Sequence, residues 1–434
     1  MYNLISFGGI FLLMAVAWAF STDRRVINWR VVLWGTALQL VFAVFIFVLP
    51  AGSRTFLIVN DVVVKVLDSA MAGTKFLFGR LALPPGMQNE MGEESLGFIL
   101  AFQALPTIVF FASLMGVLYY IGLMPWLIGI FSKTFTRLMR ISGAESMSTA
   151  ANIFVGVESA TTVRPYLDRM TNSELCTILT GGMATIASSV MALYVFILQK
   201  QFPTIAGHLV SASILAAPAA IVMSKLLVPE TGRPETLGLD VKPHYEREST
   251  LMEAVINGAN AGVRLVAGIA ALLLALMGLV ALVDLVVAGS GSGINSLIGT
   301  HIDWSLKGLL GYLFYPFALI IGVPISDATL VAQLIGERTV LTEVKSYQDL
   351  AAALESGVLK DPRSAVLAAY ALCGFAHIPS LAIFVGGTAA LAPERAGDLA
   401  RVGFRALFAA VLACLMIAAV AGTFYTQGSV LLGK

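Results

Sequence analysis

The passage Ile153-Phe-Val-Gly-Val-Glu158-Ser-Ala-Thr-Thr-Val163 places a carboxylate, hydroxyl groups and a glycine inside an apolar stretch. A second passage repeats this order, Ile320-Ile-Gly-Val-Pro-Ile-Ser-Asp327-Ala-Thr-Leu-Val331. Each is followed by a long apolar segment with a polar interruption, Gly181-Gly-Met-Ala-Thr185-Ile-Ala-Ser-Ser189 and Cys373-Gly-Phe-Ala-His377-Ile-Pro379-Ser380 respectively. Repeated interrupted segments of this kind indicate a membrane protein whose broken helices meet near the middle of the bilayer.

The composition of the whole chain also indicates a membrane protein. Of the 434 residues, 58% are hydrophobic and only 12% are charged, whereas a soluble protein carries about 25% charged residues. This excludes a soluble enzyme and a disordered protein, and a net charge of +1 gives no general attraction to nucleic acid. The three cysteines lie in apolar stretches, so we expect buried thiols rather than disulfides.

The apolar stretches predict an all-α polytopic membrane protein. A spanning helix needs about 20 mostly apolar residues. Two regions, 146–170 and 303–335, are broken by Gly, Pro and acidic residues, and we expect re-entrant hairpins there, where protein or water covers irregular backbone. Eight segments are predicted as full spans: 4–21, 31–50, 98–122, 173–199, 206–227, 259–287, 364–388 and 402–425.

Basic residues predict the orientation of these spans. With eight spans, the basic residues of the short loops fall on one side, which is then the cytoplasm, and both termini are predicted outside, in the periplasm. The first apolar run has no basic residue before it and no clear cleavage site, so we expect a retained span of an inner-membrane protein. The basic residues concerned are Arg24, Arg25, Arg30, Lys133, Arg137, Arg140, Arg164, Arg169, Arg233, Lys242, Arg247, Arg395 and Arg401.

A polar segment with Pro and Gly, 229–250, is predicted to be a cytoplasmic linker between two halves. The longer segments 51–97 and 336–362 are expected outside, and 54–80 alternates apolar and polar residues as an interfacial helix does. The predicted organisation is 1–97 with the first two spans and this helix, 98–228 with the first hairpin and an interrupted helix at 173–199, the linker, and 251–434 with the second hairpin, an interrupted helix at 364–388 and the last span.

Ionisable residues at membrane depth supply the functional hypothesis. A charge there costs about 2.5–3.5 kcal/mol even on the lenient insertion scale, so Glu158 and Asp327 are expected to face protein, water, substrate or an ion. The alternative is that each is a structural cap in a hairpin tip. His377 lies in a span that Pro379 interrupts, and its imidazole can both donate and accept hydrogen bonds. The pattern favours a secondary transporter with its site between the two hairpins.

The chain resembles the concentrative nucleoside transporter family from about residue 31 to its C-terminus. The resemblance implies eight spans, two re-entrant hairpins and a homotrimer, in which an elevator-type transport region moves against a scaffold. It also implies uptake of nucleosides, coupled to sodium in many members and to protons in others. The matching passages are Ala101-Phe-Gln-Ala-Leu-Pro-Thr-Ile-Val-Phe-Phe111, Leu118-Tyr-Tyr-Ile-Gly122, Val163-Arg-Pro-Tyr-Leu167, Ser173-Glu-Leu175, Thr185-Ile-Ala187, Ala371-Leu-Cys-Gly-Phe-Ala376 and Leu391-Ala-Pro-Glu-Arg395.

The resemblance also implies an ion site made of oxygen atoms. The family's Asn side chain and Val carbonyl in the first hairpin match Asn152 and Val155, and its hydroxyl and carbonyl in the broken fourth span match Thr185 and Ile186. Neutral oxygen ligands suit a hard monovalent cation such as Na⁺.

The substrate site departs from the family pattern at three positions. Val157 stands where the family has Gln followed by a hydroxyl residue, Asp327 stands for a Glu that contacts ribose, and His377 stands for an Asn. A modified or purine nucleoside, or another polar ring compound, is therefore admissible. The implied roles are the base end for Glu158 and Ser159, sugar hydroxyls for Asp327, His377 and Ser380, and packing against the ligand for Phe375.

The leading hypothesis is a sodium-coupled symporter of nucleosides or close analogues, with the lipid bilayer and further copies of the chain as its partners. A proton-coupled transporter using Glu158, Asp327 or His377 is the first alternative. A non-transporting membrane sensor on the same scaffold is the second. No nucleophile–base pair is visible, so an enzyme is not expected.

Overall fold

The computed structural model describes residues 1–88, 92–244, 248–299 and 303–426. Within these ranges the chain is helical and forms no extended strand, which confirms the all-α prediction. The α-helices are α1 (Tyr2–Ala19), α2 (Trp29–Phe47), α3 (Pro50–Phe78), α4 (Leu100–Gln103), α5 (Leu105–Tyr120), α6 (Leu123–Met139), α7 (Gly143–Ala151), α8 (Asn172–Ala184), α9 (Ser188–Leu198), α10 (Ile205–Leu227), α11 (Leu251–Ile298), α12 (Leu306–Ile320), α13 (Ile325–Val340), α14 (Glu343–Glu355), α15 (Pro362–Leu372), α16 (Ile378–Leu391) and α17 (Ala396–Thr423). Three 3₁₀ helices, η1 (Gly79–Ala82), η2 (Val157–Arg169) and η3 (Pro393–Arg395), complete the described elements.

The predicted spans correspond to long apolar helices. Among the described residues, seven stretches are long and apolar enough to cross a membrane, and each matches one predicted span. The eighth prediction, 364–388, falls on two shorter helices, α15 and α16, because the helix is broken between them. The predicted interfacial segment 54–80 falls on α3.

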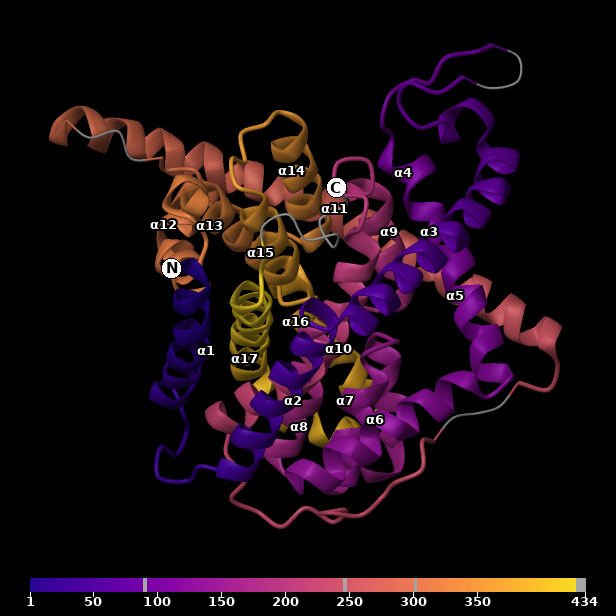
Figure 1. The fold of residues 1–434 in the computed structure, drawn as a ribbon, viewed down its shortest axis with the longest axis vertical. Helices are drawn as coiled ribbons and strands as arrows, with labels where there is room; N and C mark the ends of the chain where they lie inside the picture. The colour runs from indigo at the N-terminus through magenta and orange to yellow at the C-terminus, as the bar shows by residue number, and fades with distance from the viewer. Residues whose placement is uncertain (89–91, 245–247, 300–302, 427–434) are drawn as a thin grey trace.

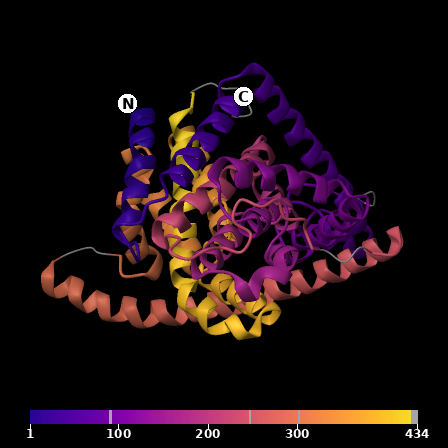
Figure 2. The ribbon, with the colours of Figure 1, turned by 90° about the horizontal axis from the view of Figure 1, so that it is seen from below.

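The helices differ in how much of their surface is buried within the protein. The helices α8, α10, α15 and α17 pack against one another and are buried along most of their length. In contrast, α11 packs mainly against α5 and exposes large hydrophobic side chains along its length. Figures 1 and 2 show α11 crossing one face of the molecule and reaching beyond its body at both ends.

Small residues bring α5 and α11 into backbone contact. A Cβ atom on Gly116 would lie 2.6 Å from the carbonyl oxygen of Ala254, and one on Gly258 would lie 2.7 Å from that of Ala112. Close packing through glycine and alanine is the usual way in which helices associate in membranes, where no hydrophobic effect drives them together. The two helices therefore form one tightly joined pair.

The first hairpin consists of α7 and η2. Its helix begins with a capping box, in which the Ser142 hydroxyl accepts from the Glu145 N–H and the Glu145 carboxylate accepts from the Ser142 N–H. The other Glu145 oxygen lies 2.8 Å from the buried Lys225 ammonium of α10. This buried ion pair joins the base of the hairpin to α10. Removing either partner would leave an uncompensated buried charge, which is strongly destabilising.

The region predicted as the second hairpin, 303–335, contains α12 and most of α13, which turn back on each other between Ile320 and Ile325 and pack together. A further turn, between α13 and α14, falls at Leu341 and Thr342, beyond that interval. Because this turn lies at the cavity described below, we call α13 and α14 the second hairpin. The segment 336–362, expected as an outer connection, instead contains α14, which buries Glu343, Tyr347 and other residues of one face. The mixed charges of this segment favoured an exposed connection, although one face of its helix is buried.

Two interrupted helices, α8–α9 and α15–α16, come into contact at their breaks. The break between α8 and α9 spans Thr185 to Ala187, and the break between α15 and α16 spans Cys373 to His377. Gly374 has φ +111°, and a Cβ there would lie 2.5 Å from the Ala184 carbonyl oxygen. Only glycine fits, because it has no Cβ and adopts positive φ without strain.

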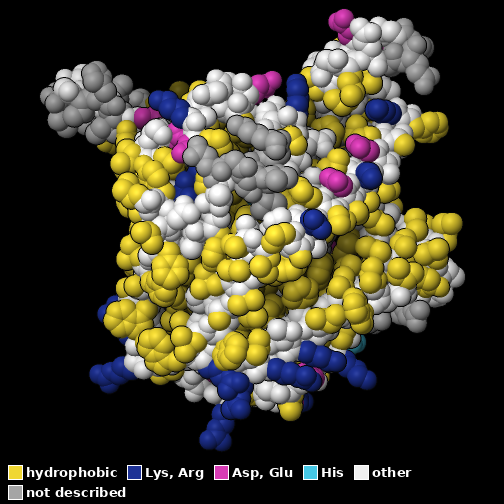
Figure 3. Space-filling view, in the orientation of Figure 1, with side chains coloured by type: hydrophobic (Ala, Val, Ile, Leu, Met, Phe, Trp, Pro, Cys, Tyr) yellow, Lys and Arg dark blue, Asp and Glu magenta, His cyan; other side chains and the backbone are white. Residues whose placement is uncertain are grey.

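Charged and hydrophobic side chains are separated on the surface. Figure 3 shows a broad hydrophobic band across the middle of one face and a row of Lys and Arg side chains along its lower edge. In the same orientation, that edge carries the connections between α1 and α2 and between α10 and α11, and the N-terminus lies away from it (Figure 1). Tyr425, near the end of the described chain, accepts a hydrogen bond from the Asn3 side chain and so lies beside the N-terminus. This distribution matches the predicted grouping of basic loops.

Candidate functional site

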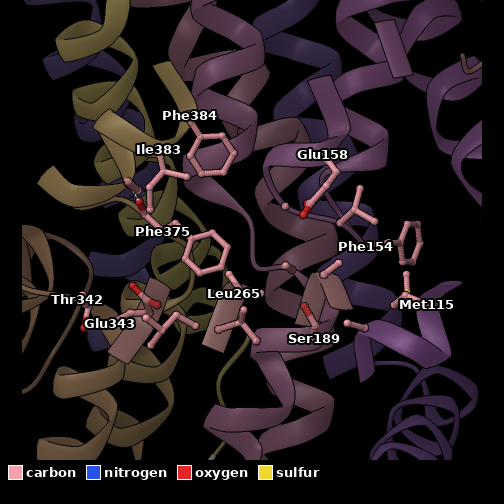
Figure 4. A pocket seen from close by; sticks show the side chains of 18 of the residues that line it. Met115, Phe154, Glu158, Ser189, Leu265, Thr342, Glu343, Phe375, Ile383 and Phe384 are labelled. Carbon is pink, nitrogen blue, oxygen red and sulfur yellow. Dashed lines mark hydrogen bonds between the residues drawn. The ribbon is translucent and has the colours of Figure 1, made fainter. Parts of the chain in front are cut away.

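A cavity of about 350 Å³ opens between the two hairpins, the two interrupted helices and the α5–α11 pair. Its size lies within the range of about 300–1,000 Å³ that is usual for small-molecule sites. Figure 4 shows Glu158 and Glu343 on opposite sides of it, with the Phe375 ring between them. Its lining includes Ala112, Met115, Gly116, Tyr119, Phe154, Val155, Gly156, Glu158, Thr161, Thr162, Ser189, Ala261, Leu265, Ile269, Leu272, Thr342, Glu343, Phe375, His377, Ser380, Ile383 and Phe384.

The first hairpin contributes Glu158, which lies in the first turn of η2 and is exposed to the cavity. Ser159 follows it but is buried and does not line the cavity; its N–H donates to the Gly156 carbonyl. The side chain of Val157 lies outside the described part of the structure. The hairpin tip therefore offers one carboxylate to a ligand.

The second hairpin contributes Glu343, the first residue of α14. Its side chain is 3% exposed, and its two oxygens meet different partners. The Tyr194 hydroxyl donates to Oε1, and His377 Nε2 lies 2.7 Å from Oε2. The N-terminus of α14 also favours the carboxylate, because unpaired backbone N–H groups carry partial positive charge there.

His377 occupies the N-cap position of α16. The Ser380 N–H donates to its Nδ1 at 3.1 Å, so Nδ1 is an acceptor and the proton of the neutral imidazole lies on Nε2, facing Glu343. The Ser380 hydroxyl donates in turn to the carbonyl oxygens of Phe375 and His377. At the break, the imidazole of His377 and the hydroxyl of Ser380 therefore both form hydrogen bonds with nearby backbone groups.

Aromatic rings form the apolar part of the site. Phe375 packs edge-on to His377, with ring centroids 6.3 Å apart, and lies 6.4 Å from Phe384. Phe384 itself is held over Gly182 of α8, where a Cβ would lie 2.3 Å from the ring. These rings give a flat ligand an apolar surface between the two carboxylates.

Asp327 does not line the cavity. Its carboxylate accepts from the backbone N–H groups of Lys360 and Asp361, at 3.2 and 2.9 Å. It lies near the start of α13, and at a rise of 1.5 Å per residue that helix separates it from the hairpin tip by about 20 Å. Asp327 therefore belongs to the connection that precedes α15.

The four residues expected to bind an ion lie on two adjoining segments. Asn152 and Val155 follow α7, and Thr185 and Ile186 form the break after α8. The segments are joined by a hydrogen bond from the Ser188 N–H to the Phe154 carbonyl, at 3.0 Å. Val155 and Ile186 lie outside helices, so their carbonyls are not committed to helical hydrogen bonds.

The oxygen atom of the Asn152 side chain fits a cation. Its Nδ2 donates to the Ser148 carbonyl at 3.0 Å, which turns Oδ1 the other way. Oδ1 is buried and has no hydrogen-bond partner among the described residues. A buried acceptor without a partner calls for an explanation, and a hard cation ligated by neutral oxygens supplies one.

Glu343 and Thr342 were not identified from the sequence. Thr342 is the N-cap of α14, and its buried hydroxyl lines the cavity without a hydrogen-bond partner in the described ranges. A signal was available, because Thr followed by Glu before an apolar run is typical of a helix N-terminus. Such a start directly after α13 would have indicated the hairpin tip.

Sequence families cover most of the chain. Residues 8–81 match the family described as Na⁺ dependent nucleoside transporter N-terminus, and residues 208–422 match the corresponding C-terminus. Residues 101–201, which include the first hairpin and the first interrupted helix, match a family described as nucleoside recognition.

Individual relatives agree over nearly the whole chain. An uncharacterized transporter of Haemophilus influenzae is 37% identical, over 98% of this chain and 99% of its own. Solute carrier family 28 member 3 of Eptatretus stoutii is 36% identical over 98% of this chain, which spans about three fifths (61%) of that protein. The structure of CNTnw in an inward-facing, substrate-bound state superimposes with a TM-score of 0.86 at 36% identity, over 98% of both chains. A doubly substituted CNTnw in an outward-facing state gives a TM-score of 0.87.

Proposed function

The chain belongs to the Na⁺-dependent nucleoside transporter family, and on this premise we propose that it takes up nucleosides or close analogues by sodium-coupled symport. Its relatives are membrane transporters and not enzymes, and sodium is the coupling ion of the family. The resemblance inferred from the sequence is thereby confirmed.

The observation that carries the proposal is a cavity with a carboxylate at each end and aromatic rings between them. Glu158 and Glu343 are both hydrogen-bond acceptors when ionised, and Thr342 adds a free hydroxyl. A nucleoside has a flat base with N–H donors at one end and a sugar with O–H donors at the other. Nucleotides are disfavoured, because their phosphates would meet two carboxylates without an opposing Lys or Arg among the lining residues.

We assign Glu158 to the base and Glu343 with Thr342 to the sugar hydroxyls. Phe375 packs against the ligand. Val157 and Ser159 shape the hairpin tip, and Ser380 supports the break that holds Phe375. Asp327 takes no part in binding, since both of its oxygens accept backbone hydrogen bonds away from the cavity.

We also propose how the protein lies and moves in the membrane. The basic edge in Figure 3 faces the cytoplasm of the cell whose inner membrane holds the protein, which places both termini outside. The α5–α11 pair serves as the scaffold, with the exposed side of α11 turned to further copies in a homotrimer. The hairpins and interrupted helices move against this pair in the manner of an elevator.

The coupling ion is proposed to bind Asn152, Val155, Thr185 and Ile186, and the side-chain ligand can be tested. Replacing Asn152 by Ala should raise the sodium concentration for half-maximal uptake about tenfold, because a charged hydrogen-bond or ligand contact is worth about 1.5–3 kcal/mol. Asn257→Ala, at an exposed amide of α11, is the control and should leave the sodium dependence unchanged. An unchanged sodium dependence of Asn152→Ala would remove this residue from the ion site.

The proposed function is tested by uptake of labelled uridine and adenosine into proteoliposomes. We expect accumulation with an inward sodium gradient and none with a proton gradient alone. The buried Asn152 Oδ1, without a hydrogen-bond partner in the part of the chain that the structure describes, supports this expectation, because it suits a role as a cation ligand. Accumulation driven only by protons would replace sodium as the coupling ion. Binding without accumulation would indicate a sensor.

A further inference from the structure

Both oxygens of Glu343 are contacted by residues that do not come from its own hairpin: Oε1 accepts from the Tyr194 hydroxyl, and Oε2 lies 2.7 Å from His377 Nε2. Tyr194 lies on α9, after the first helix break, and His377 lies at the second break. Tyr194 is fully buried, and its ring stacks on Tyr347 with centroids 4.6 Å apart, so its hydroxyl has a fixed position behind the carboxylate. The carboxylate is therefore contacted by α9 and by the break before α16.

Both ring nitrogens of His377 already have a contact within the protein. Nδ1 accepts the Ser380 N–H, and Nε2, which carries the proton, faces Glu343 at 2.7 Å. A neutral imidazole has one donor and one acceptor: the acceptor is in use, and the donor nitrogen lies against Glu343 Oε2.

Glu343 keeps free acceptor capacity. An ionised carboxylate has about four lone-pair sites. The Tyr194 hydroxyl donates to Oε1, and His377 Nε2 lies 2.7 Å from Oε2. The remaining sites belong to a residue that lines the cavity. A ligand hydroxyl can therefore bind Glu343 but finds no partner on His377.

We propose that Tyr194 and His377 are positioning residues for Glu343: they fix its carboxylate so that its remaining lone pairs accept hydroxyl groups of the sugar, and His377 does not itself touch the substrate. This rests on the proposed function for the identity of the ligand. It differs from the role expected from the sequence, in which His377 holds a hydroxyl directly. Recognition of the sugar then depends on the registry of three elements, α9, α14 and the break before α16.

The test is a double-mutant cycle on purified protein, with uridine binding read from ligand-induced thermal stabilisation so that weak variants remain measurable. Tyr194→Phe and His377→Asn should each weaken uridine binding about tenfold, as expected for the loss of one hydrogen bond to a charged group. In a Glu343→Gln background, the same two changes should weaken it less than about twofold, because the residue that they position no longer carries a charge. Coupling of this kind is what a cycle isolates.

Tyr347→Phe is the matched control. It removes the hydroxyl of the other ring in the same stack, which donates to the Ala369 carbonyl and not to Glu343, so uridine binding should not change. If His377→Asn still weakens binding tenfold in the Glu343→Gln background, His377 contacts the ligand and the proposal is wrong.

The proposed function and this inference can fail separately. If the unsubstituted protein neither binds nor takes up any nucleoside, the proposed function is wrong. The positioning of Glu343 by Tyr194 is then tested from the melting temperatures of the variants without ligand. Tyr194→Phe and Glu343→Gln should be non-additive there, since they remove the same hydrogen bond. If the shifts in melting temperature of the two variants were additive, the proposed positioning of Glu343 would be wrong whatever the substrate.

Discussion

Glu343→Gln is expected to lower nucleoside uptake at sub-saturating substrate by about 100-fold. The change keeps the shape of the side chain but converts charge-assisted hydrogen bonds to neutral ones, at about 1.5–3 kcal/mol for each such bond. It also places an amide N–H₂ where one of the two oxygens now accepts from Tyr194 or lies against His377. Uptake kinetics in proteoliposomes would show the loss mainly as a raised KM.

Two carboxylates serve as controls for this prediction. Glu355→Gln, at the exposed end of the same helix, should leave uptake unchanged. Asp327→Asn should leave the KM unchanged and lower only the melting temperature, because its oxygens accept backbone N–H groups. If Asp327→Asn raised the KM while Glu343→Gln did not, the sugar site would lie where the sequence first placed it.

Gly374→Ala is expected to destabilise the protein by about 3 kcal/mol or more. The residue has φ +111°, a region that costs side-chain-bearing residues about 1–3 kcal/mol. Its new Cβ would also lie 2.5 Å from the Ala184 carbonyl and 3.0 Å from the Cys414 sulfur, so the crossing of the interrupted helices would have to open. Thermal unfolding in detergent and the yield of folded protein would report the change.

Gly386→Ala is the matched control, on α16 beyond the break. A Cβ there would meet nothing within 4 Å, and alanine favours a helix over glycine by up to about 1 kcal/mol. This variant should be as stable as the unsubstituted protein or slightly more so. A Gly374→Ala protein with the same melting temperature would mean that the crossing is not close-packed.

Local patterns predicted the helices and the first hairpin well. Runs of about 20 apolar residues identify spans by length alone, and the breaks at Thr185 and His377 carry polar residues that a continuous span would exclude. The first hairpin is short, so a few residues of sequence contain its helix, its tip and Glu158. The proposed ion ligands lie on these same short segments.

The second half of the site depends on distances that the sequence does not show. Asp327 follows Gly-Val in a pattern like that of Glu158, yet α13 begins there and carries the chain away before the tip is reached. Which carboxylate reaches the cavity is decided by the length of that helix. The contact of Glu343 with Tyr194, which is 149 residues away in the chain, is equally invisible in a linear pattern.

The joined pair α5–α11 has a consequence for the rate of transport. Apart from the Tyr119 hydroxyl, the cavity wall that it supplies is apolar, with Ala112, Met115, Gly116, Ala261 and Leu265 among its lining residues. In the elevator motion proposed above, a ligand held by Glu158 and Glu343 would keep its hydrogen bonds as it passes such a wall and would exchange only dispersion contacts, each worth about 0.1–0.2 kcal/mol per atom pair. In that motion the wall would contribute little to the activation barrier, which would arise from the rearrangement of the hairpins and of the surrounding lipid.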